Sequence, residues 1–138
     1  TASRETYRIK GETMITVHDY TSGRVFEDAL CYSFYPIDLH DEKGVVPRHL
    51  KHGTVPTIPR GALIPKGSKN IMVAGRCVSS DRLANSAARV QASSMGMGQA
   101  AAVTAVLAAR LKTTPGEVPL EEIYAELKKH KAIVPARS

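Results

Sequence analysis

One stretch of the sequence combines residue types that can hold an electron-rich ligand. It runs from Asn70 to Ala102 as NIMVAGRCVSSDRLANSAARVQASSMGMGQAAA. The apolar run that ends at Gly75 predicts a strand buried on both faces, where the glycine lets backbone approach a ligand closely. A polar loop is expected over residues 79–88, and a buried helix over about residues 90–111. The start of that helix offers unpaired N–H groups and the positive end of a helix dipole.

The residues before this stretch must form the frame that positions it. Residues 6–16 mix β-branched and charged residues around Gly11, which predicts two short strands and a turn. Thr16 stands three residues before Asp19 and Gly23 follows, which predicts a capped helix over residues 17–22.

Two further segments complete the expected frame. Residues 41–69 are rich in proline and glycine, so we expect loop and edge-strand material with little core of its own. Near the end, Pro119 and two glutamates predict the start of a surface helix. Its apolar face would comprise Leu120, Ile123, Tyr124 and Leu127.

Composition excludes several classes of function. Lysine and arginine outnumber aspartate and glutamate by 19 to 13 in 138 residues, but the basic residues are scattered without an aromatic stripe. The pattern therefore argues against a nucleic-acid-binding module, and suits an anionic ligand or an ordinary solvated surface. Cys31 and Cys77 lie far apart in the sequence, with no Cys-x-x-Cys motif, so no disulfide framework or metal site is indicated. We expect both to be small buried thiols. The longest apolar run is too rich in alanine and glycine to predict a membrane span.

The stretch from Asn70 to Ala102 resembles the C-terminal cofactor motif of the FAD-dependent oxidoreductase family, the flavoproteins that fold like glutathione reductase and fumarate reductase. Further segments match the family in the same order, so the resemblance covers nearly the whole chain. These segments are SRETYRIKGE, YPIDLHD, IPRGALIPKGSKNIMVAGR and VPLEEIYAELKKHKAIV. Tyr7 departs from the family pattern, in which a basic residue is usual.

The resemblance implies cofactor-binding roles for five residues. Gly75 and Arg76 would lie beside the ribityl and pyrophosphate part of FAD. The N–H groups of Val90 and Gln91 would face the pyrimidine edge of the flavin and stabilise its reduced anion, and Arg89 would add positive charge. The alternative interpretation is that these residues have only a structural role in ordinary packing between a strand and a helix.

The implied reaction is hydride exchange at flavin N5, for which three residues are catalytic candidates. His40 is either a proton donor or acceptor, or a hydrogen-bonded loop histidine. Arg60 and Arg4 are either clamps for an anionic substrate or structural ion-pair partners.

The family's N-terminal glycine-rich fingerprint is not found in this sequence, since Gly96 and Gly98 lie within the predicted helix. We therefore expect the isolated chain to bind FAD weakly or not at all and to be inactive. The sequence starts without methionine and without a signal-peptide profile, as if cut, and we expect a cytoplasmic protein.

The predicted fold class is α/β, as an α+β fragment: the C-terminal portion of a two-domain FAD-binding oxidoreductase. Residues 1–69 would be substrate-domain strands and loops, residues 70–112 the last strand and helix of the FAD domain, and residues 113–138 a surface helix and tail. The expected partners are a small-molecule substrate, a missing N-terminal FAD-binding half or partner chain, and further copies of the chain. The alternative is a noncatalytic or partner-dependent subunit that completes a flavoprotein assembly.

Overall fold

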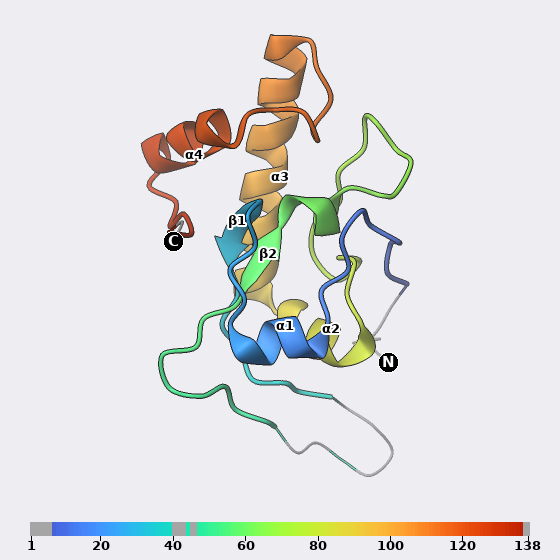
Figure 1. Ribbon diagram of the computed structural model, residues 1–138, viewed down its shortest axis with the longest axis vertical. Coiled ribbons are helices and arrows are strands. Elements are labelled where there is room, and N and C mark those ends of the chain that lie inside the picture. The colour runs from blue at the N-terminus through green and yellow to red at the C-terminus, as the bar shows by residue number, and fades with distance from the viewer. Residues whose placement is uncertain (1–6, 40–43, 45–46, 137–138) are drawn as a thin grey trace.

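The other elements pack around one long helix in the computed structural model, which describes residues 7–39, 44 and 47–136 (Figure 1). The elements follow one another as α1 (Val17–Ser22), β1 (Ala29–Tyr32), β2 (Thr57–Pro59), the 3-10 helix η1 (Arg60–Leu63), α2 (Arg82–Ala88), the long helix α3 (Gln91–Leu111) and α4 (Leu120–Lys129). Helices α1 and α2 lie together near the start of α3, and α4 crosses α3 closer to its other end (Figure 1). This mixture of helices and strands agrees with an α+β fragment.

Strands β1 and β2 form an antiparallel two-stranded sheet, and β1 packs on α3. The sequence predicted little core for residues 41–69, and this was wrong. Ile58 in β2 and Leu63 in η1 are fully buried, because β2 pairs with β1 and its side chains enter the main core. The paired residues are Ala29 with Pro59, Cys31 with Ile58 and Tyr32 with Thr57, with an irregularity between Ala29 and Cys31.

Helix α1 has the bounds that its capping pattern predicted. The Asp19 N–H donates to the Thr16 hydroxyl at 3.2 Å, and the Thr16 N–H donates back to the Asp19 carboxylate at 2.9 Å. Gly23 ends the helix with a φ of 72°, in the left-handed region that glycine enters without steric cost. The predicted helix over residues 17–22 is confirmed.

Helix α2 stands where a polar loop was expected over residues 79–88. Asp81 starts this helix, because one oxygen of its carboxylate accepts the Ala84 N–H at 2.8 Å. The other oxygen accepts the Val17 N–H at 2.6 Å, so the same carboxylate also holds the start of α1. The loop prediction was wrong because it gave more weight to polarity than to this N-cap and the alanines that follow it.

Residues 70–76 do not form the expected strand in the described structure. The Val73 N–H donates to the Leu63 carbonyl at 2.8 Å, but no ladder continues from this bond. Ile71 is 56% exposed. A strand buried on both faces needs paired neighbours and apolar layers over both faces, and the described residues do not supply these to the segment.

Residues 7–16, which we call the N-terminal strap, also lack the two predicted strands. The strap is extended and makes isolated bridges at Gly11 and Ile15. A β-carbon on Gly11 would lie only 2.7 Å from the Ser79 β-carbon and 2.8 Å from the Gly61 carbonyl oxygen. A β-carbon on Gly61 would in turn lie 2.5 Å from the Thr13 hydroxyl. These two glycines therefore allow the strap to lie directly on η1 and the segment around Ser79.

Helices α3 and α4 are confirmed by position, but the burial of α3 was predicted wrongly. Met95 and Val106 on α3 are 75% and 50% exposed, because β1 and α4 cover only one side of this helix. Helix α4 docks with the predicted apolar face, and the Tyr124 hydroxyl donates to the Ala29 carbonyl at 2.6 Å. The α3 residues that are buried are Ser93, Met97, Ala100, Thr104, Leu107 and Ala108.

By length and composition, α3 is a candidate membrane-spanning helix, although the alanine and glycine content of its sequence predicted no membrane span. The structure buries 33% of its most apolar 18-residue window. Core helices of soluble proteins meet the same criteria, and one side of α3 packs on β1 and α4. The absence of a membrane partner therefore stays a prediction.

Candidate functional site

The turn at Gly75 lies beside the first turn of α3. Gly75 has a φ of 87°, which L side chains rarely adopt, and the Val78 N–H closes the turn by donating to the Gly75 carbonyl at 3.0 Å. A β-carbon on Gly75 would lie 3.7 Å from the Ser94 hydroxyl. Two segments that the sequence predicted to share one cofactor are therefore neighbours.

The backbone at Arg76 is held by Asn85, a residue that the sequence did not single out. The amide group of Asn85, on α2, donates to the Arg76 carbonyl and to the Ser80 hydroxyl, each at 3.1 Å. Asn85 is fully buried, and its Oδ1 atom accepts no hydrogen bond from the described residues. The available signal was a lone amide in the small-residue run LANSAA, which is a weak one because asparagine is common in loops.

Arg89, between α2 and α3, directs its charge toward Asp38. One terminal nitrogen of the guanidinium lies 3.3 Å from the Asp38 carbonyl oxygen and 3.7 Å from the Asp38 carboxylate. Asp38 is also held by the Ser86 hydroxyl, which accepts its N–H at 3.1 Å. The Arg89 side chain is only 12% exposed, and its Nε atom is buried without a hydrogen-bond partner among the described residues.

The start of α3 presents backbone donors that have no partner in the described part of the chain. Val90 is the N-cap residue, with a ψ of 158° and no side-chain cap. The N–H groups of Val90, Gln91, Ala92 and Ser93 make no hydrogen bond to any described residue. Because α3 has 21 residues, this end carries the full positive partial charge of a helix dipole. It can hold an oxyanion or an electron-rich ring edge.

A chain of buried hydroxyl groups fixes the position of this helix start. The Ser93 hydroxyl is 2.8 Å from the Ser33 hydroxyl, which is 2.8 Å from the Tyr20 hydroxyl. Burial raises the pKa of Tyr20, so its hydroxyl stays protonated at neutral pH. The hydroxyl chain joins α1, the segment after β1 and α3, and the sequence contained no spacing that predicts it.

Of the three catalytic candidates, the structure describes only Arg60. Arg60 starts η1, and its guanidinium donates to the Val118 carbonyl at 2.6 Å and contacts the Pro115 carbonyl at 3.5 Å. These carbonyls precede α4 and follow the C-terminal end of α3, whereas Gly75 lies beside its N-terminal turn. His40 and Arg4 lie outside the described residues.

A comparison with known protein families shows the family to which this chain belongs. The family model described as FAD dependent oxidoreductase matches residues 2–129. The chain belongs to this family. No curated protein and no solved structure matches the chain. Membership in the FAD dependent oxidoreductase family implies a flavin-dependent oxidoreductase type of function and FAD as the cofactor.

The start of α3 and the Gly75 turn fit the needs of this family's cofactor. Unpaired N–H groups at the positive end of a helix match the electron-rich edge of a flavin ring. The glycine presents bare backbone, and the buried Arg89 Nε is an additional donor without a partner among the described residues. Among the same residues, no group of three or more histidine, cysteine, aspartate or glutamate side chains is placed to hold a metal ion.

Proposed function

We propose that this chain supplies the flavin-ring side of the FAD site in an oxidoreductase that exchanges a hydride with a small substrate. The observation that supports it best is the set of unpartnered N–H groups at the start of α3 beside the Gly75 turn. When bound, FAD supplies the hydride acceptor or donor at N5 of its ring.

Each residue of the proposed site has a defined part. The N–H groups of Val90 and Gln91 would stabilise negative charge on the pyrimidine edge, which favours the reduced cofactor. Gly75 leaves room for the backbone to approach the ligand. Arg76 would pair with oxygen acceptors of the cofactor. Arg89 lies close to the Asp38 carboxylate, so we expect it to add less positive charge at the cofactor than a guanidinium without an acidic neighbour would.

The organisation of the surrounding protein belongs to the same proposal. Residues 1–69 would serve the substrate side, residues 70–112 the cofactor, and residues 113–138 would cover the surface of the fold. The adenosine and pyrophosphate parts of FAD would be held by a further segment or a partner chain, so the isolated chain would bind FAD weakly and be inactive. We expect copies of the protein to associate, in the cytoplasm.

The proposal is tested by substituting Gly75 with alanine in the natural gene product that contains this segment. Gly67→Ala is the matched control, because Gly67 has a similar φ of 81° and nothing within 4 Å of its added β-carbon. Both variants place an alanine at a similar positive φ, but only Gly75→Ala narrows the proposed site. We expect Gly75→Ala to weaken FAD binding about tenfold or more, and Gly67→Ala to change it about twofold at most, by fluorescence titration. Equal affinities in the two variants would contradict the proposal.

The exposed side of α3 favours a second candidate function. A noncatalytic or partner-dependent subunit would use this side to dock on the flavoprotein that it completes. Met95 and Val106 are exposed there and lie eleven residues apart, about three helical turns on one face. A natural gene product that lacks flavin absorption but acquires it on mixing with a partner would favour this second candidate.

A further inference from the structure

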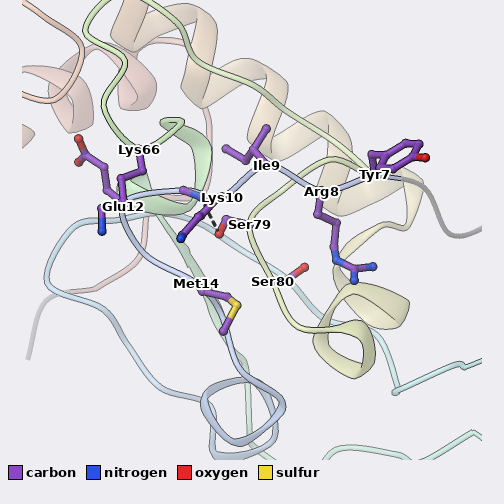
Figure 2. A pocket seen from close by; sticks show the side chains of 10 residues that line it. Tyr7, Arg8, Ile9, Lys10, Glu12, Met14, Lys66, Ser79 and Ser80 are labelled. Carbon is purple, nitrogen blue, oxygen red and sulfur yellow. Dashed lines mark hydrogen bonds between the residues drawn. The ribbon is translucent and has the colours of Figure 1, made fainter.

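The N-terminal strap forms one wall of a groove that the flavin proposal does not use. We call it the strap groove: it lies between residues 7–14, Lys66 and the segment at Ser79 and Ser80, and has a volume of about 680 Å³ (Figure 2). Backbone hydrogen bonds fix its walls, from the Ile9 N–H to the Cys77 carbonyl at 2.9 Å and from the Lys66 N–H to the Lys10 carbonyl at 2.8 Å.

Three cationic side chains line the strap groove, and no residue in the described part of the chain neutralises them. Arg8, Lys10 and Lys66 make no ion pair and no side-chain hydrogen bond with any described residue. Glu12 is the acidic residue of the lining, so the groove carries a net charge of about +2. In Figure 2, Glu12 and Lys66 stand at one end, Arg8 at the other, and Lys10 between them.

A buried serine adds a hydrogen-bond donor to these charges. The Ser79 hydroxyl accepts the Gly11 N–H at 3.0 Å, and within the described structure it donates to nothing. Ser79 is 2% exposed, so its hydroxyl is held in place by the fold. The Ser80 hydroxyl, in contrast, already donates to the Val78 carbonyl and accepts from Asn85. The groove therefore combines solvent-accessible positive charges at its rim with a buried neutral donor in its floor.

We propose that the strap groove binds a small dianion, held by ion pairs to Lys10 and Lys66 and by a hydrogen bond from Ser79, with Arg8 adding positive charge at the far end. Two negative charges match the net charge of the lining. A pair of carboxylates and a phosphate both have this chemistry. The strap bonds to Cys77, two residues after Gly75, so the groove adjoins the proposed flavin turn. The further assignment of this anion as the charged group of the substrate rests on the proposed flavin function.

The binding step is tested directly by calorimetry, without reference to flavin. The probes are inorganic phosphate and succinate, with acetate as a monoanion for comparison, in a buffer of low ionic strength. We expect binding of at least one dianion and weaker binding of acetate. Tighter binding of succinate would assign the site to carboxylates, and tighter binding of phosphate would assign it to a phosphoryl group. Binding of neither dianion at millimolar concentrations overturns the proposal.

Three variants separate a built site from general attraction by a basic protein. Lys10→Gln with Lys66→Gln should weaken dianion binding about tenfold or more. Lys51→Gln with Lys128→Gln removes the same charge from exposed positions elsewhere and should change binding about twofold at most. Glu12→Gln removes the opposing carboxylate and should strengthen binding. Equal losses in the two double variants, or no gain in Glu12→Gln, would overturn the proposal.

The readout also separates this proposal from the flavin proposal. Anion binding that persists in a protein without affinity for FAD leaves the strap groove intact and overturns only its role as the substrate site. FAD binding that is unchanged in Lys10→Gln with Lys66→Gln, together with lost anion binding, supports both proposals. FAD binding without any anion binding would overturn the strap-groove proposal and leave the flavin proposal intact.

Discussion

Cys31 lies in the buried strand β1, whereas Cys77 is partly exposed in the turn after Gly75. Burial raises the pKa of the Cys31 thiol to about 12, so this thiol is almost entirely protonated and unreactive at pH 8. We expect a disulfide reagent to modify one thiol rapidly in the folded protein and the second only after unfolding. Cys77→Ser should abolish the rapid phase and Cys31→Ser should preserve it; the reverse pattern would contradict the structure.

Asp19 couples the stability of α1 to pH. Burial raises its pKa, but hydrogen bonds from Arg24 and Thr16 outweigh this effect and hold the pKa below its ordinary value of 3.8. The carboxylate therefore stabilises the fold above the unfolded-state pKa, and this contribution is lost as the pH falls through the folded-state pKa. We expect Asp19→Asn to lower the free energy of unfolding by about 1 kcal/mol at pH 7, and by less at pH 2.

Urea unfolding between pH 7 and pH 2 measures this effect. The exposed Glu122→Gln is the control, and its unfolding free energy should stay within about 0.5 kcal/mol of the parent protein at pH 7. A difference between Asp19→Asn and the parent that does not shrink on acidification would contradict the role assigned to this carboxylate.

The sequence predicted which local segments would lie at the candidate site, but it did not predict the side-chain contacts that depend on long-range packing. The local pattern predicted a glycine turn and a helix start, and the family resemblance assigned cofactor roles to Gly75, Val90 and Gln91. The structure brings these two segments together. Asn85 and Ser93 were missed because their partners lie elsewhere in the fold. The Ser93 hydroxyl meets Ser33, which is 60 residues away along the chain.

At the scale of elements, Asp81 joins the starts of two helices through one side chain. Its carboxylate accepts N–H groups from both Ala84 on α2 and Val17 on α1. We expect Asp81→Ala to lower the free energy of unfolding by about 2 kcal/mol, since it removes a helix cap and a second charge-assisted hydrogen bond. Asp81→Asn keeps one oxygen acceptor and should lose about half as much. Chemical denaturation measures the free energy of unfolding of both variants. An alanine variant as stable as the parent protein would refute the double role of Asp81.

The elements that the sequence predicted well carry their own start and stop signals. Helix α1 has a capping box and a terminal glycine, and α4 has an acidic first turn and a one-sided apolar face. The strand prediction for residues 70–76 was wrong because a strand needs neighbouring strands to pair with. The apolar residues of this segment do not by themselves provide such neighbours. Helix α2 was not predicted because its small polar residues are also common in loops.

For the whole molecule, the exposed side of α3 predicts concentration-dependent association. Met95 and Val106 place apolar surface on one face of a helix whose opposite face is buried. Light scattering across a range of concentrations should show a mass above that of the monomer. Met95→Lys with Val106→Lys should shift the protein to the monomer, whereas Lys51→Gln should not. A monomer at all concentrations in the parent protein would contradict this expectation.

The tight contact between the N-terminal strap and η1 also bears on how the protein can change over evolution. Neither Gly11 nor Gly61 tolerates a β-carbon without displacing its neighbours, so substitution at either position is strongly constrained. The side chains at the rim of the strap groove carry no such constraint, because Arg8, Lys10 and Met14 are not fully buried. Mutations can therefore exchange the charge and shape of the rim while the walls stay in place. The same scaffold can acquire a new ligand specificity without first losing stability.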